Sequence, residues 1–108
     1  MYNNYMLTVI ESPEFIASAA DIWTDEEREA FINWISANPD AGDVIPGTRG
    51  LRKARWKRQG MGKRGGARAV YFVRNSRGEV LLLIAYAKAK FDNLPVHFLN
   101  RLKEQYDV

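Results

Sequence analysis

Basic side chains are the residues of this sequence most able to do chemistry. Every charged residue from 44 to 78 is lysine or arginine, eleven in all, whereas the first 43 residues hold nine acids and one base, and the last 30 hold four of each. Cations at this density repel one another, and a polyanion relieves that repulsion. The pattern therefore favours a nucleic-acid backbone as the partner.

Alternation along the expected strands indicates which cations could act together. We expect strands at 51–58, 67–74 and 80–88, separated by a glycine-rich connection and a tight turn. Lys53 and Arg55 share one face of the first strand, Arg68 projects from the second, and Lys88 ends the third. A sheet face that carried all four would gather several cations in one small region.

The rest of the chain supplies the elements that would position these cations. We expect a strand at 5–10, a helix starting at Ser12-Pro13, a second helix from the capping box at Thr24 to about Ala37, and a last helix opened by 93–95. The order β-α-α-β-β-β-α predicts an α+β fold, with a mainly antiparallel sheet of about four strands and the helices packed on one face. The run 80–88, apolar on both faces, is expected to be the central strand.

Length and composition narrow the class of protein. A chain of 108 residues predicts one domain spanning 1–108. The absence of cysteine excludes disulfides and thiolate metal sites. The N-terminal segment lacks the pattern of a signal peptide, and the longest apolar run is far too short to span a bilayer. We therefore expect a cytoplasmic protein with no membrane partner.

Two long motifs carry a family resemblance. Residues 42–53, GDVIPGTRGLRK, resemble the GD-x-I-x-G-T-G-G-L-R-K motif of HigB-like toxins in the RelE/ParE superfamily, and residues 62–72, GKRGGARAVYF, resemble their GKRGG-(A/S)-R-x-(I/V)-YY motif. Tyr86-Ala87-Lys88 falls where these toxins carry Y-(A/G)-K-N-E. The sequence departs from the pattern at Arg49 in place of glycine, at Phe72 in place of the second tyrosine, and at Ala89-Lys90 in place of Asn-Glu.

The resemblance implies a fold, an activity and partners. The fold would be that of the RelE-like toxins. The activity would be that of a type II toxin: an mRNA interferase that cuts messages on the ribosome, without a metal ion or other cofactor. The partners would be the ribosome, mRNA and a cognate helix-turn-helix antitoxin.

The resemblance also implies roles for individual residues. Lys53 and Arg55 resemble paired basic residues on the second strand of RelE-type toxins, where one would act as base and both would bind phosphate. Arg68 resembles the third-strand arginine that would hold the scissile phosphate, and its planar fork suits a phosphorane. Lys88 is our candidate for stabilising transition-state charge or protonating the leaving group. Neighbouring cations favour the neutral form of a lysine, which would allow such a residue to move protons.

A second set of residues is expected to contact RNA outside the chemical step. Tyr86 or Tyr71 could stack on a base or orient the 2′-OH. The others would contact the RNA backbone, which needs many charges and little geometry; they are Arg52, Lys57, Arg58, Lys63, Arg64 and Lys90. The single histidine, His97, is expected to be structural or at the surface.

Other interpretations of the same residues stay open. A solvated sheet face, or a clamp on ribosomal RNA without chemistry, would use the same lysines and arginines. The ParE branch of the superfamily poisons DNA gyrase instead of cutting RNA. A degenerate member could bind nucleic acid without cutting it, and the loss of Asn-Glu after Lys88 favours that alternative.

Overall fold

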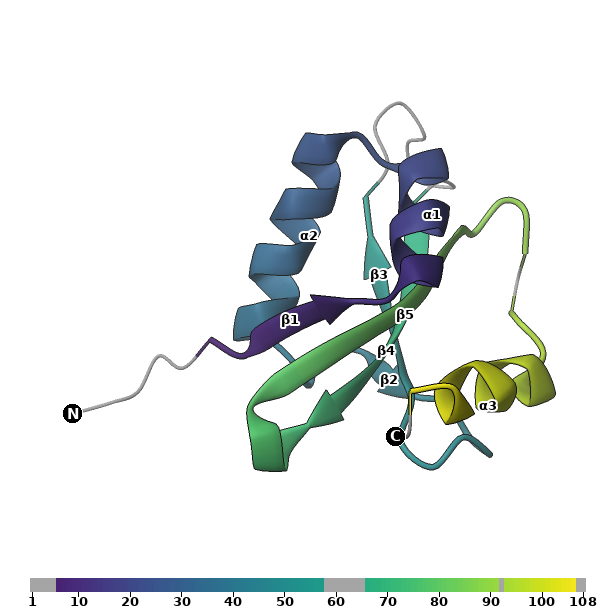
Figure 1. Ribbon diagram of the computed structural model, residues 1–108. Helices are drawn as coiled ribbons and strands as arrows, with labels where there is room; N and C mark the ends of the chain where they lie inside the picture. Colours follow the sequence, from purple (N-terminus) through teal and green to yellow (C-terminus); the bar gives the residue numbers. More distant parts are fainter. Residues whose placement is uncertain (1–5, 58–65, 92, 107–108) are drawn as a thin grey trace.

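A curved sheet lies between helices in this structure (Figure 1). The computed structural model describes residues 6–57, 66–91 and 93–106. Along the chain these residues form β1 (Thr8–Glu11), α1 (Pro13–Ile22), α2 (Asp25–Ala37), β2 (Asp43–Val44), β3 (Arg52–Trp56), β4 (Ala67–Arg74), a 3-10 turn η1 (Asn75–Arg77), β5 (Glu79–Ala87) and α3 (Val96–Glu104). Of these helices, α1, α2 and α3, none is long and apolar enough to cross a membrane within the described ranges.

The first two helices begin where the sequence predicts. Ser12 is the N-cap of α1, its hydroxyl accepts a hydrogen bond from the backbone N–H of Phe15, and Pro13 occupies the first helical turn. Thr24 caps α2 in a reciprocal capping box with Glu27. Because these signals are local hydrogen bonds between near neighbours, the helix starts can be read directly from the sequence.

The sheet has five strands in the order β1-β5-β4-β3-β2. All neighbours are antiparallel except β1, which runs parallel to β5. This arrangement confirms the mainly antiparallel α+β fold and places β5 inside the sheet. The strand beyond the four that we expected is the two-residue β2. It pairs with the start of β3, in a segment for which we expected only a loop.

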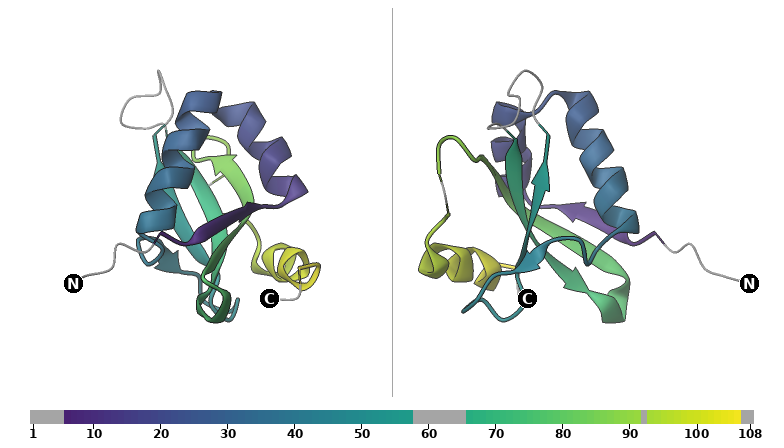
Figure 2. Two further views of the ribbon diagram at one scale, coloured as in Figure 1. Left: turned by 60° about the vertical axis from the view of Figure 1, so that its left-hand side comes forward. Right: turned by 180° about the vertical axis from the view of Figure 1, so that it is seen from behind.

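The helices cover both faces of the sheet (Figure 2). One apolar cluster joins the sheet to α1 and α2, and a second joins the opposite face to α3 through Leu99 and Leu102. The expectation that all helices pack on one face is therefore wrong. The physical reason lies in β4 and β5, since a strand that is apolar on both faces must be covered on both.

Aromatic side chains dominate the layer beneath α1 and α2. The Phe31 ring lies 5.2 Å from Trp23 and 5.5 Å from Trp56, and Trp34 lies 5.1 Å from Trp56, as measured between ring centroids. The indole N–H groups of Trp23 and Trp56 donate to the backbone carbonyls of Lys57 and Glu27, at 2.9 and 3.2 Å. The tryptophans therefore tie α1 and α2 to β3 and serve as packing residues.

Candidate active site

Paired strands bring three of the predicted catalytic cations to one face. Arg55 on β3 stands directly opposite Arg68 on β4, and Lys53 stands opposite Val70. The intervening Ala54 belongs to the cluster beneath α1 and α2, so Lys53, Arg55 and Arg68 point to the face that α3 covers in part. Directly opposed side chains on such a ladder have Cβ atoms about 5 Å apart. The side chains of Arg55 and Arg68 thus start side by side on paired strands.

Lys53, Arg55 and Arg68 form a cationic row across β3 and β4, and a β-bulge extends this row to Tyr86 on β5. Arg68 pairs with Tyr86, but the register shifts between Val70 and Tyr71, where Val70 pairs with Ile84 and Tyr71 with Leu82. One extra residue on β5 reverses the alternation, so that Tyr86 joins the α3-side cluster together with Leu81. Bulges of this kind re-aim side chains near functional sites. Without the bulge, Tyr86 would point away from Arg68.

Tyr86 contributes a hydroxyl to an otherwise cationic row. Its side chain is buried, and its ring meets that of Phe91 edge-on at 6.3 Å between centroids. Burial raises the pKa of the Tyr86 hydroxyl, and the positive charge of Arg68 acts in the opposite direction. The hydroxyl therefore stays protonated near neutral pH and is suited to donate a hydrogen bond, while Arg68 supplies the positive charge.

Lys88 lies at the end of this row. It directly follows β5, is partly exposed, and its backbone N–H donates to the carbonyl of Gly66 at 3.3 Å. Gly66 immediately precedes β4, so Lys88 continues the same ladder one pair beyond Ala67 and Ala87, and two pairs beyond Arg68 and Tyr86. The guanidinium of Arg68 donates to the carbonyl of Ala67 at 3.2 Å. Because Lys53 stands opposite Val70 and Lys88 opposite Gly66, the two lysines lie at different ends of the candidate site.

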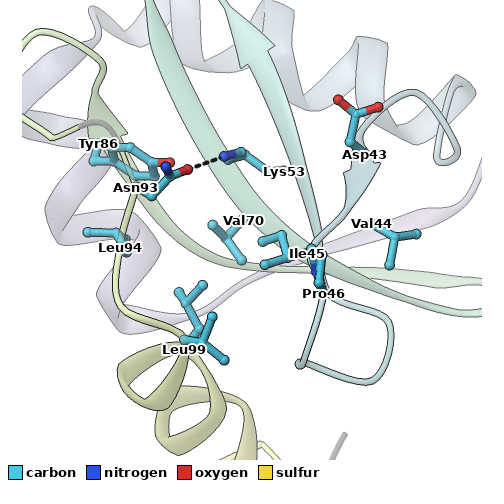
Figure 3. A pocket seen from close by; sticks show the side chains of 11 residues that line it. Asp43, Val44, Ile45, Pro46, Lys53, Val70, Tyr86, Asn93, Leu94 and Leu99 are labelled. Atoms are coloured by element: carbon cyan, nitrogen blue, oxygen red, sulfur yellow. Dashed lines mark hydrogen bonds between the residues drawn. The ribbon is translucent and has the colours of Figure 1, made fainter.

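A pocket of about 490 Å³ opens beside the row (Figure 3). Lys53, Val70 and Tyr86 belong to the sheet beneath it. The rest of its lining comes from residues 43–46 and from Asn93, Leu94, Val96 and Leu99. The ammonium Nζ of Lys53 donates to Oδ1 of Asn93 at 2.6 Å and is directed away from Asp43. Apolar walls with a few polar groups are typical of ligand sites. Asn93 was not predicted as a site residue, because in the sequence it marks only the start of the last helix.

Comparison with known proteins bears on the fold. No family model matches the sequence. Among solved structures, the chain is similar to a double arginine-to-alanine mutant of the E. coli toxin RelE in the free state, with a TM-score of 0.57 and 13% sequence identity over 81% of this chain and 88% of that chain. The chain has the RelE-like fold. This confirms the fold predicted from the sequence motifs, and at 13% identity the likeness concerns the fold alone.

Two residues predicted to contact RNA lie elsewhere in this RelE-like fold. Arg52 points to the opposite side of β3, where its Nη1 donates to the carbonyls of Gly42 at 2.7 Å and Asp40 at 3.3 Å. Tyr71 is fully buried, donates to the carbonyl of Pro39 and accepts from the N–H of Gly42, both at 2.8 Å. Burial and these bonds leave no Tyr71 surface for stacking on a base. Both residues instead fasten the segment between α2 and β2.

The other predicted RNA contacts are dispersed. Lys57 is exposed just after β3, and Lys90 is exposed with its Nζ 5.7 Å from the centroid of the Phe91 ring. Arg58, Lys63 and Arg64 lie outside the described residues. His97 is exposed on α3. Within the described parts of this RelE-like chain, no group of three or more His, Cys, Asp or Glu residues could hold a metal ion.

Proposed function

We propose that this protein is the toxin of a type II toxin–antitoxin pair and a ribosome-dependent mRNA endoribonuclease. The observation that carries the proposal is the common face of Lys53, Arg55 and Arg68 on two paired strands, with Tyr86 in register on a third. The RelE-like fold and the sequence motifs add support. The toxin acts in the cytoplasm, where translating ribosomes present mRNA, and a helix-turn-helix antitoxin restrains it.

The proposed reaction is attack of a ribose 2′-oxygen on the adjacent phosphorus. A new P–O bond forms, the bond to the 5′-oxygen breaks, and the products carry a 2′,3′-cyclic phosphate and a free 5′-hydroxyl. The 2′-OH proton passes to a base and the 5′-oxygen receives a proton from an acid. Between these proton transfers, the phosphorane carries extra negative charge that fixed cations stabilise.

Each member of the site has a part in this reaction. Arg68 holds the scissile phosphate through its guanidinium fork, and Arg55 beside it adds a second cation. Lys53 contacts the 2′-OH and is the proposed acceptor of its proton. Lys88, at the other end of the ladder, protonates the leaving oxygen or offsets its charge. Tyr86 donates a hydrogen bond to a phosphate or ribose oxygen, in keeping with its raised pKa.

The decisive experiment replaces Arg68 by alanine and uses Arg77→Ala as a matched control. Arg77 is an exposed arginine in the η1 turn, outside the row. After induction of the Arg68 variant in cells, growth should continue, and primer extension on total mRNA should show no new 5′ ends. The Arg77 variant should arrest growth and cut mRNA as the native chain does. Full growth arrest by Arg68→Ala would contradict the phosphate-holding role.

The same experiment separates the proposal from the two other interpretations. A gyrase poison arrests growth without producing new 5′ ends in mRNA, and Arg68→Ala need not relieve that arrest. A protein that binds nucleic acid without cutting leaves mRNA intact in the native chain as well. Since the ribosome supplies alignment of the RNA, the pure protein should cut naked RNA only weakly. Robust cutting of free RNA would contradict ribosome dependence.

A further inference from the structure

Arg49 adopts a backbone conformation that its side chain disfavours. Its φ is +58°, and it is the only non-glycine residue with positive φ in the described ranges 6–57, 66–91 and 93–106. The neighbouring positive φ values belong to Gly47 and Gly50, at +82° and +108°. In an L-residue this conformation brings Cβ close to the following carbonyl oxygen, which is why glycine is usual there. An arginine here therefore costs folding free energy.

The surrounding structure holds this strained position in place. The ammonium of Lys103 on α3, itself only 8% exposed, donates to the carbonyl of Thr48 at 2.9 Å and to that of Arg49 at 3.5 Å. Asn100 Nδ2 donates to the carbonyl of Gly47 at 3.0 Å. The buried Thr48 hydroxyl donates to the carbonyl of Ile45 at 2.6 Å. Strain that is maintained by so many bonds is characteristic of functional positions.

The Arg49 side chain borders a polar pocket between its loop and α3. The loop from β2 to β3 runs beside α3 (Figure 1), and the pocket of about 390 Å³ is lined by Gly47, Arg49, Asn100, Lys103 and Glu104. Two cations thus stand against one acid. None of these residues lines the pocket beside Lys53, so this is a separate place on the molecule.

We propose that Arg49 is a further RNA-backbone contact, which binds a phosphate group at the loop between β2 and β3, away from the site of cleavage. A guanidinium fork can bind two phosphate oxygens at once, and Arg49 is exposed. The contact adds affinity and orientation without base recognition, as phosphate contacts generally do. The inference rests on the proposed function only in taking RNA as the polyanion.

The test compares Arg49→Gly with Arg49→Lys in binding RNA. The probe is a short, dye-labelled, single-stranded RNA in which every 2′-OH is methylated, so that it binds but is not cut. Fluorescence anisotropy gives Kd over a series of KCl concentrations. Arg49→Gly removes the charge and the backbone strain together, whereas Arg49→Lys keeps a cation and the strain. Arg77→Ala, on the η1 turn, removes one charge elsewhere.

The expected result is a more stable protein that binds RNA less well. Arg49→Gly should raise Tm by a few degrees, because glycine tolerates positive φ. It should also raise Kd about fivefold. The plot of log K against log salt should become less steep by about 0.7, which is the change expected when one phosphate contact to a single strand is lost. Arg49→Lys should keep the native salt dependence and have a Kd between those of the native chain and Arg49→Gly, because lysine keeps the charge but lacks the fork. Arg77→Ala should keep the native slope.

Equal binding by Arg49→Gly and the native chain would overturn the inference, as would equal weakening by Arg49→Gly and Arg77→Ala. Should Arg49→Gly lower Tm, Arg49→Asn decides the same question, because asparagine tolerates this conformation and carries no charge. Failure of the proposed function looks different: the native chain would then produce no cuts in translated mRNA, whether or not Arg49 contributes to binding of the methylated RNA.

Discussion

Lys53 holds its ammonium against a neutral acceptor. The amide oxygen of Asn93 lies 2.6 Å from Nζ, and the side chain turns away from Asp43, which stands opposite Lys53 on β2. An amide orients an ammonium without neutralising its charge, so the lysine stays available to a phosphate or a 2′-OH. A carboxylate in the same place would form an ion pair with Lys53 and compete with the RNA.

This difference predicts that two substitutions at Asn93 lower the cleavage rate to different extents. Asn93→Asp should lower the single-turnover rate of mRNA cleavage on programmed ribosomes about tenfold or more, because the new carboxylate occupies Lys53. Asn93→Ala should lower it only about two- to threefold, since the lysine loses orientation but not charge. A rate for Asn93→Asp equal to that for Asn93→Ala would rule out this positioning role.

The sequence predicted part of the candidate site, through the alternation of side chains along each strand. Strict alternation placed Lys53, Arg55 and Arg68 correctly on one face, because period-two geometry is local. It misjudged Tyr71, whose burial depends on the Pro39–Gly42 segment folding over it. It also missed Asn93, which meets Lys53 only through a contact between residues 40 positions apart. Contacts of this kind follow from the tertiary fold and have no local signature.

At the scale of elements, the segment between α2 and β2 is fastened through Gly42. Its N–H donates to the Tyr71 hydroxyl, and Arg52 donates to its carbonyl. A Cβ on Gly42 would lie 2.8 Å from the Tyr71 hydroxyl oxygen and 2.9 Å from the backbone of Lys53. Backbone atoms of a paired strand have little room to retreat. The close approach therefore requires glycine for reasons of space.

Two glycine-to-alanine substitutions test this reasoning. Gly42→Ala should lower the free energy of unfolding by about 2–3 kcal/mol, through overlap with β3 and loss of the Tyr71 bond. Gly78→Ala should lower it by only about 1 kcal/mol, because Gly78 has positive φ but open space around it. Urea denaturation measures both values. A larger loss for Gly78→Ala than for Gly42→Ala would refute the steric account.

The order of the elements could be predicted from the sequence, whereas some of their pairings could not. The helix starts at Ser12 and Thr24 and the hairpin between β4 and β5 follow from caps and turn residues close in sequence. The side on which α3 packs and the pairing of β2 depend on distant partners. The bulge that turns Tyr86 towards Arg68 is likewise a property of the β4–β5 pair. These features emerge only when the whole sheet is assembled.

At the scale of the whole molecule, α3 forms its layer alone and is tied to the rest at its C-terminal end. The Tyr106 hydroxyl donates to Glu14 in the first turn of α1, and Arg74 Nη2 donates to the Tyr106 carbonyl at 2.7 Å. The hydrogen bond to Glu14, followed by burial, raises the pKa of Tyr106 above its ordinary value of 10.0. Two layers on opposite sides of the sheet are thus joined around its edge.

This link predicts a pH-dependent effect of Tyr106→Phe. A raised pKa means that the folded state binds this proton more tightly, so the stabilisation is complete below pH 10.0 and is lost as the pH rises through the folded-state pKa. Near neutral pH, the variant should have a Tm a few degrees below that of the native chain. As the pH rises above 10.0 and through the folded-state pKa, the two Tm values should converge. An unchanged difference across this range would exclude the link.

The tryptophans of this chain all belong to the layer beneath α1 and α2. Ultraviolet emission from the protein consequently monitors that layer, and it should change when α1 or α2 loosens. A ligand that settles among Lys53, Arg68 and Tyr86 occupies the other side of the sheet and should leave the emission nearly constant. Capture of RNA is therefore best followed through a dye on the oligonucleotide, while indole fluorescence serves as an independent monitor of folding in the same cuvette.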